Sequence, residues 1–252
     1  MKDNKFTLTA IGVLAMMLTT VSHEVFGHGA ACLLSGGRIE HISNTLFACS
    51  LRDPWVAGGG PFGDLLIGAL SLLIDLALPA RRTGWRLFFT AAMAFSFFWE
   101  TGYLAKAMLV RDGDLYFFVY GLLGRVDDTW RIAGIAVGAI LFLLTIRLTQ
   151  ARLSAVLVDA ARARAAARTI WLAAALAEIA AALVFKGDIW PSLRDAALEI
   201  GLAAAPLLLI PRGDATGEAP PPLARNWAVI TLAACFFTVF AVTVGHGLGA
   251  FS

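Results

Sequence analysis

The chain alternates long apolar stretches with short polar connections, and this pattern is the main guide to its structure. A stretch of about 20 residues that is poor in charge can cross the hydrocarbon core of a bilayer as a helix. About seven stretches fit that description. They run over Phe6 to about Leu34, Gly58 to Pro79, Trp85 to Val110, Trp130 to Leu148, Thr169 to Phe185, Leu193 to Ile210 and Trp227 to Leu248.

One further apolar stretch, Leu115 to Leu123, is too short to span a bilayer and predicts a re-entrant or interfacial segment. Composition agrees with a membrane protein: 59% of the 252 residues are hydrophobic and 15% are charged, against about 25% charged in soluble domains. The net charge of +2 gives no reason to expect nucleic acid as a partner. We therefore predict an all-α, multi-pass integral membrane bundle whose surroundings are bilayer lipid.

The two parts of the chain differ in chemical content. Residues 1–128 hold three predicted spans, the short apolar segment and every recognisable motif, whereas residues 129–252 predict additional transmembrane helices of unassigned role. Loops on the side of the N-terminus carry more Lys and Arg than the opposite loops, which favours an inside N-terminus. The three cysteines have no CxxC spacing, so neither a disulfide framework nor a cysteine metal site is expected. His41 is expected in a polar surface loop.

The first apolar stretch contains His23-Glu24-Val25-Phe26-Gly27-His28, which includes two of the four histidines of the chain. Polar side chains in such a segment are costly to bury unless they are paired or bind a metal ion. Two histidines beside a glutamate are the metal ligands and general base of zinc hydrolases. The motif therefore indicates hydrolytic zinc chemistry at membrane depth. The plainer interpretation is a polar helix end whose histidines bind water or a neighbouring helix.

The motif is one residue longer than the usual HExxH spacing. On a regular α-helix, His23 and His28 would lie roughly 140° apart and could not easily chelate one ion. A π-bulge between Val25 and Gly27 would bring residues i and i+5 to one face, and Gly27 makes such a distortion cheaper. Alternatively, Glu24 and His28 are the facing pair and Glu24 is itself a ligand. The sequence leaves both solutions open.

Four segments carry a resemblance to a known family. His23 to Ala31 resembles an HExxH motif followed by glycine and small residues, and Leu33 to Ile39 contains Gly-Gly-Arg-Ile. Gly58 to Leu66 resembles a Gly-Pro entry into a helix, and Arg111 to Asp114 offers an aspartate in an Asp-Gly context. Together they resemble the site-2-protease family of intramembrane zinc metalloproteases, over roughly Leu18 to Leu123.

The resemblance implies a zinc ion held by His23, His28 and an aspartate, with Glu24 as the general base. We expect Asp114 to be the third ligand and keep Asp112 in reserve. The family often hydrolyses peptide bonds within helical membrane proteins, which would make a transmembrane protein the substrate. Asp64 is expected either to hydrogen-bond to a ligating histidine or to stabilise the start of its helix.

Two other functions compete with this interpretation. A membrane zinc hydrolase that acts on a lipid amide would use three histidine ligands, with His246 as the third. A non-enzymatic membrane protein or transporter would use the same His/Asp cluster as a metal or ion site. Alternate spans run in opposite directions, so His28, Asp114 and His246 are all expected toward one membrane face. Glu100 is expected to pair with a neighbour or to snorkel.

Overall fold

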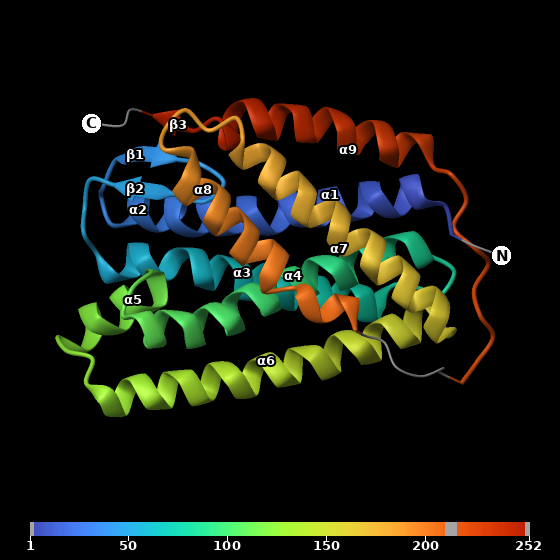
Figure 1. The fold of residues 1–252 in the computed structure, drawn as a ribbon, viewed down its shortest axis with the longest axis horizontal. Coiled ribbons are helices and arrows are strands. Elements are labelled where there is room, and N and C mark those ends of the chain that lie inside the picture. Colours follow the sequence, from blue (N-terminus) through green and yellow to red (C-terminus); the bar gives the residue numbers. More distant parts are fainter. Residues whose placement is uncertain (1–2, 210–215, 250–252) are drawn as a thin grey trace.

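A computed structural model describes residues 3–209 and 216–249 of the chain (Figure 1). The structure is mainly helical, and its helices run roughly along the long axis of the molecule. The α-helices are α1 (Lys5–Val21), α2 (Ala30–Leu34), α3 (Pro54–Ala77), α4 (Thr83–Val110), α5 (Asp114–Leu123), α6 (Asp128–Leu157), α7 (Ala160–Ala182), α8 (Ile189–Ala196) and α9 (Trp227–Phe240). Three π-helical segments, η1 (Ser22–Gly29), η2 (Ala197–Leu202) and η4 (Ala241–Gly245), and a 3₁₀ turn, η3 (Ala205–Leu208), join or extend them.

Side-chain caps fix where many of these helices begin. The residue before the first turn accepts a hydrogen bond from a backbone N–H that has no partner inside the helix. Asp53 caps α3 in this way, and Pro54 follows it at a position where the missing proline N–H costs nothing. The same role is taken by Asn4, Asp127, Asp159, Asp188 and Asn226.

Five helical segments in the described part of the chain are long and apolar enough to cross a membrane, so the chain has the character of a multi-pass membrane protein. They are Lys5–Leu34, Pro54–Ala77, Asp128–Leu157, Ala160–Ala182 and Trp227–Gly245. The expected count of about seven is not confirmed. The predicted span from Leu193 is broken into α8, η2 and η3, and its last residue, Ile210, lies outside the described residues.

The interior of the bundle lies around α1, α4 and α7. The core includes Phe95, Phe98 and Met93 of α4 and Met16 of α1, which are fully buried where these helices pack together. Helix α4 is long, at 28 residues, but it carries polar groups and is not among the apolar spanning helices. By contrast α6 and α9 lie along opposite edges of the molecule and expose most of their apolar side chains, as expected for lipid-facing helices (Figure 1).

The all-α expectation misses a small antiparallel sheet with the strand order β2-β1-β3. β1 (Ile39–Ile42) is central and pairs with β2 (Phe47–Cys49) and with β3 (Leu248–Gly249). The expectation that His41 lies at the surface is also wrong: it sits in β1 with 1% of its area exposed. The sheet, α5 and the C-terminal end of the described chain all lie at one end of the molecule, opposite the N-terminus (Figure 1).

The cysteine prediction requires a correction as well. Cys32 of α2 forms a disulfide with Cys49 of β2, while Cys235 is free and exposed. Sequence spacing alone did not reveal the pair because β2 folds back over the helix end. Disulfides persist in oxidising compartments. The bond between Cys32 and Cys49 therefore requires an oxidising environment around this end of the bundle.

The disulfide gives a direct test of this arrangement. In the denatured, non-reduced protein we expect a thiol reagent to label Cys235 and to leave Cys32 and Cys49 unmodified until a reductant is added. Cys49→Ser should lower the stability of the sheet end by about 3 kcal/mol, as loop closure predicts for a short loop, whereas Cys235→Ser should leave the melting temperature unchanged. Mass spectrometry counts the labels, and labelling of all three cysteines without reductant contradicts the pairing.

Candidate metal centre

The candidate site begins with the helix that carries the histidine motif. Between α1 and α2 the backbone is π-helical over Ser22–Gly29, so the predicted irregularity at Val25 to Gly27 is confirmed. The wider π turn places residues i and i+5 on one face. His23 and His28 consequently stand side by side, with ring centroids 4.9 Å apart. Both side chains are buried, at 2% and 4% exposure.

Close contact between two backbones brings α3 against the π-helical segment. A Cβ atom on Gly27 would lie 2.5 Å from the Gly59 carbonyl oxygen, so only glycine permits this approach. The contact allows the Val56 carbonyl and Asp64 of α3 to reach the two imidazoles. The Gly-rich start of α3 therefore positions the partners of both histidines.

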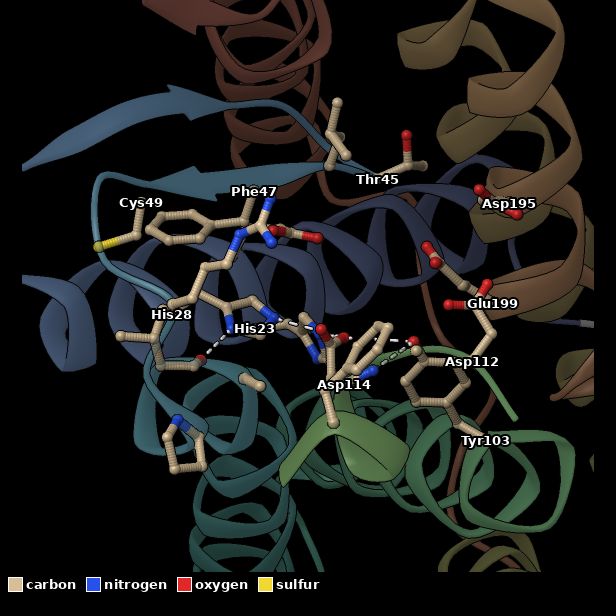
Figure 2. A pocket seen from close by; sticks show the side chains of 18 of the residues that line it. His23, His28, Thr45, Phe47, Cys49, Tyr103, Asp112, Asp114, Asp195 and Glu199 are labelled. Carbon is tan, nitrogen blue, oxygen red and sulfur yellow. Dashed lines mark hydrogen bonds and ion pairs between the residues drawn. The ribbon is translucent and has the colours of Figure 1, made fainter. Parts of the chain in front are cut away.

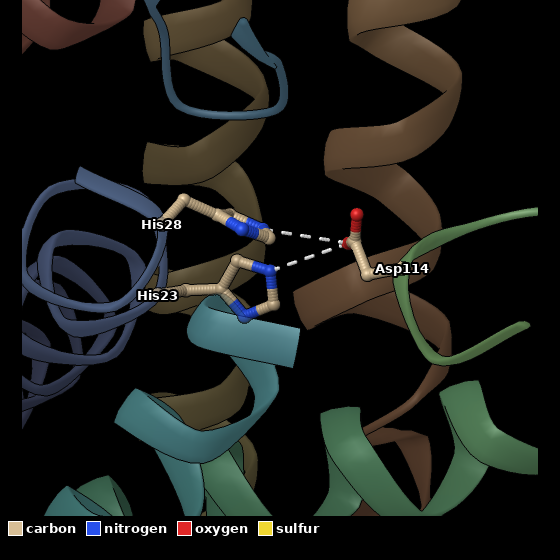
Figure 3. A group of neighbouring side chains, drawn as sticks. All are labelled: His23, His28 and Asp114. Carbon is tan, nitrogen blue, oxygen red and sulfur yellow. Dashed lines mark ion pairs between the residues drawn. The ribbon is translucent and has the colours of Figure 1, made fainter. Parts of the chain in front are cut away.

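Asp114 at the start of α5 completes a group of three possible metal ligands (Figure 3). Its Oδ2 lies 3.7 Å from His23 Nε2 and 3.5 Å from His28 Nε2. These distances are long for direct hydrogen bonds. In a tetrahedral zinc site with bonds of about 2.0–2.1 Å, ligand atoms lie about 3.3–3.4 Å apart. The two distances from Asp114 are thus close to the spacing of ligand atoms around zinc, and all three ligand atoms lie within 4.8 Å of one another.

The second nitrogen of each imidazole is held by an acceptor. His28 Nδ1 donates to the Val56 carbonyl oxygen at 2.6 Å. His23 Nδ1 lies 3.1 Å from Asp64 Oδ2 and 3.1 Å from Glu100 Oε1. Donation from Nδ1 makes Nε2 the nitrogen through which each imidazole can bind a metal ion once Nε2 has lost its proton.

Aromatic rings and a phenol hold the three side chains in place. Trp99 stacks on His23 with centroids 4.4 Å apart and an interplanar angle of 8°, and Phe47 stacks on His28 at 5.2 Å. Tyr103 Oη donates to Asp114 Oδ2 at 3.3 Å and accepts from the Asp114 backbone N–H at 3.1 Å. The geometry of the site is therefore fixed by α3, α4 and β2 together.

Charge complementarity keeps Asp114 ionised. Burial by itself would raise the pKa of this carboxyl, but the interactions with His23 and His28 lower the pKa to below its ordinary range. A divalent cation would take the place of the Nε2 protons between the ionised carboxylate and the two imidazoles.

The site opens into a cavity of about 900 Å³ (Figure 2). Glu24 lines it with 4% of its area exposed, and its Oε2 has no hydrogen-bond partner among the described residues. Asp112 also lines the cavity but does not belong to the three-ligand group. Other lining residues come from the β1–β2 hairpin, from α5 and from the segment after α7, among them Thr45, Phe117, Tyr120, Arg194, Asp195 and Glu199.

The shape of the site agrees with its donor set. A Cβ atom on Gly60 would lie 2.5 Å from His23 Nε2 and even nearer to His28 Nε2. The absence of a side chain at Gly60 thus leaves free the space in front of both ligating nitrogens. The residues present fit a divalent metal ion such as zinc, which His23, His28 and Asp114 could hold.

The structure places some of the other predicted residues beside the histidines and others away from them. Asp64 contacts His23, as one of the two readings of this residue expected. His246 is exposed, and its Nδ1 donates to the Val184 carbonyl oxygen at 3.0 Å, away from the two motif histidines. Glu100 pairs with His23. Its place in an apolar stretch predicted a pairing partner but not which residue that partner is. Tyr103 and Glu199 were missed, because neither belongs to a motif.

Comparisons with protein-family models, with curated proteins and with solved structures found no match. The function of the chain is therefore inferred from the residues of this site.

Gly60→Ala tests the space in front of the ligands. We expect the added methyl group to push both imidazoles apart and to lower zinc affinity by about 10- to 100-fold, comparable with the loss of a ligand-supporting residue. Gly84→Ala is the matched control, because a Cβ there meets its first neighbour at 3.7 Å. Metal titration of both folded proteins gives the result, and an unchanged affinity in Gly60→Ala contradicts the assigned site.

Asp64 and Glu100 offer two acceptors for one His23 N–H, so either can substitute for the other. Asp64→Ala and Glu100→Ala should each reduce zinc affinity only slightly, whereas the two substitutions together should reduce it about 10- to 100-fold. The double-variant cycle in zinc titrations measures this coupling. Strictly additive losses would show that the two carboxyls act independently.

Proposed function

We propose that this protein is an intramembrane zinc-dependent hydrolase of the peptidase type. The observation that carries the proposal is the convergence of His23 Nε2, His28 Nε2 and Asp114 Oδ2 beside the unpartnered carboxylate of Glu24 in one cavity. Two imidazoles, one carboxylate and an adjacent glutamate are the metal ligands and general base that a zinc hydrolase uses. The resemblance of the motif segments to the site-2-protease family supports the same chemistry.

Different residues of the chain would have different roles in hydrolysis. Zinc, when bound, would acidify a water molecule and polarise the scissile carbonyl group. Glu24 would accept the proton of the attacking water and pass it to the leaving amine, for which its free Oε2 is suited. Tyr103 would keep Asp114 in position, and Asp64 with Glu100 would keep the Nε2 of His23 available.

The position of the site favours a membrane-associated substrate. The motif lies in the segment Lys5–Leu34, which is long and apolar enough to span a membrane, and α3, which is so as well, packs against it. The short apolar helix α5 forms one wall of the cavity and carries Asp114. A transmembrane protein whose helix end is unwound near this face would present its peptide bonds to the cavity. The lipid-amide alternative with three histidines has no geometric support, because His246 lies elsewhere.

Separate variants distinguish the metal site from the catalytic step. His28→Ala and Asp114→Ala should lose bound zinc, which is about one per chain in the native protein. Asp112→Ala and His246→Ala should keep it. Glu24→Gln should retain zinc and lose hydrolysis of a transmembrane model peptide by about 10²- to 10⁴-fold, the usual effect of a general base.

Metal analysis and product detection by mass spectrometry are the measurements. Zinc loss in His246→Ala alone would replace this proposal with the three-histidine lipid hydrolase. Full activity in Glu24→Gln would remove the assigned base.

A further inference from the structure

The cavity has a wall opposite the metal ligands that comes from the second part of the chain. Helix α8 continues into the π-helical segment η2, and Arg194, Asp195 and Glu199 of this region line the cavity. In Figure 2, Asp195 and Glu199 face the cavity from the side opposite His23 and His28. Both Glu24 and Glu199 therefore reach the cavity from π-helical segments, which occur most often at functional sites.

Glu199 has an acceptor that nothing in the protein uses. Its Oε2 is enclosed and has no hydrogen-bond partner among the described residues. The neighbouring Asp195 differs, because Arg194 donates to its carboxylate from Nε at 2.8 Å and from Nη2 at 3.0 Å. An enclosed carboxylate oxygen without a donor is unfavourable, so its presence in the cavity wall points to a donor supplied by a ligand.

The charges around Glu199 favour a cation as that donor. Burial raises the pKa of Glu199 well above its ordinary value, and the carboxylates of Glu24 and Asp195 raise it further, while His23 opposes them. A positive group bound here would be attracted by the carboxyls of Glu199 and Glu24, and would favour the charged form of Glu199 that burial and these neighbours disfavour. The nearby cations are already engaged: Arg194 pairs with Asp195, and Lys106 lies over the Tyr103 ring at 5.0 Å.

We infer that Glu199 is a specificity residue that binds a positively charged group of the substrate, an ammonium or guanidinium, while the bond to be cleaved lies at the metal ligands. The substrate class is therefore a membrane-associated peptide with a basic side chain near the scissile bond. This inference rests on the proposed function, because it assigns the substrate of the same cavity.

Matched pairs of metal-chelating probes test it. Alkyl hydroxamates and their ω-amino counterparts, in a short series of chain lengths, differ only in a terminal ammonium group. The zinc-loaded wild-type protein should bind the best ω-amino probe about tenfold more tightly than its alkyl partner, as expected for a charge-assisted hydrogen bond. Glu199→Gln should lose this preference without weakening the alkyl probe. Glu40→Gln, an exposed glutamate on β1, is the matched control and should retain the preference.

Calorimetric titration separates the outcomes. Equal affinity for both probes in the wild-type protein, or a preference that survives in Glu199→Gln, overturns the inference and leaves the zinc hydrolase intact. Failure of every hydroxamate to bind the zinc-loaded protein removes the proposed function and this inference with it. Glu199→Asp keeps the charge on a shorter side chain and should shift the preferred ω-amino probe to a longer chain. That shift can be measured even where Glu199→Gln does not fold.

Discussion

The widened π turn at Ser22–Gly29 is the constraint on which the candidate site depends. A regular α-helix would point His23 and His28 in different directions, and no rearrangement of α5 could then place Asp114 within reach of both. The turn is held from outside by the backbone contact between Gly27 and Gly59. A π segment is less favourable than an α-helix by itself, so the packing of α3 stabilises a backbone that the motif needs.

Much of the site could be predicted from the sequence, because its chemistry is unusual in an apolar segment. The motif residues His23, Glu24 and His28 indicated a site because burying polar side chains in an apolar segment costs free energy. Helix geometry then required a π turn if both histidines were to face one ion, and the structure contains that turn. Asp114 was placed by the resemblance and by the alternating direction of the spans. Its position next to both imidazoles agrees with that prediction.

Other features depend on contacts between segments far apart in the sequence, and local patterns do not encode these. The sheet pairs β1 with β3, two strands separated by most of the chain, and the disulfide joins Cys32 to a strand that folds back over it. The predicted span from Leu193 failed because apolar composition does not exclude a broken helix. Glu199 belongs to that broken segment, so its place in the cavity wall could not be foreseen.

The two histidines of the site have unequal partners, and this difference has an electronic consequence. The N–H of His28 faces a neutral carbonyl oxygen, whereas that of His23 faces two carboxyl groups. A carboxylate draws the ring proton toward itself and makes the opposite nitrogen more electron-rich. His23 is therefore the stronger donor of the pair. An ion bound at both Nε2 atoms would therefore draw more of its electron density from His23 than from His28.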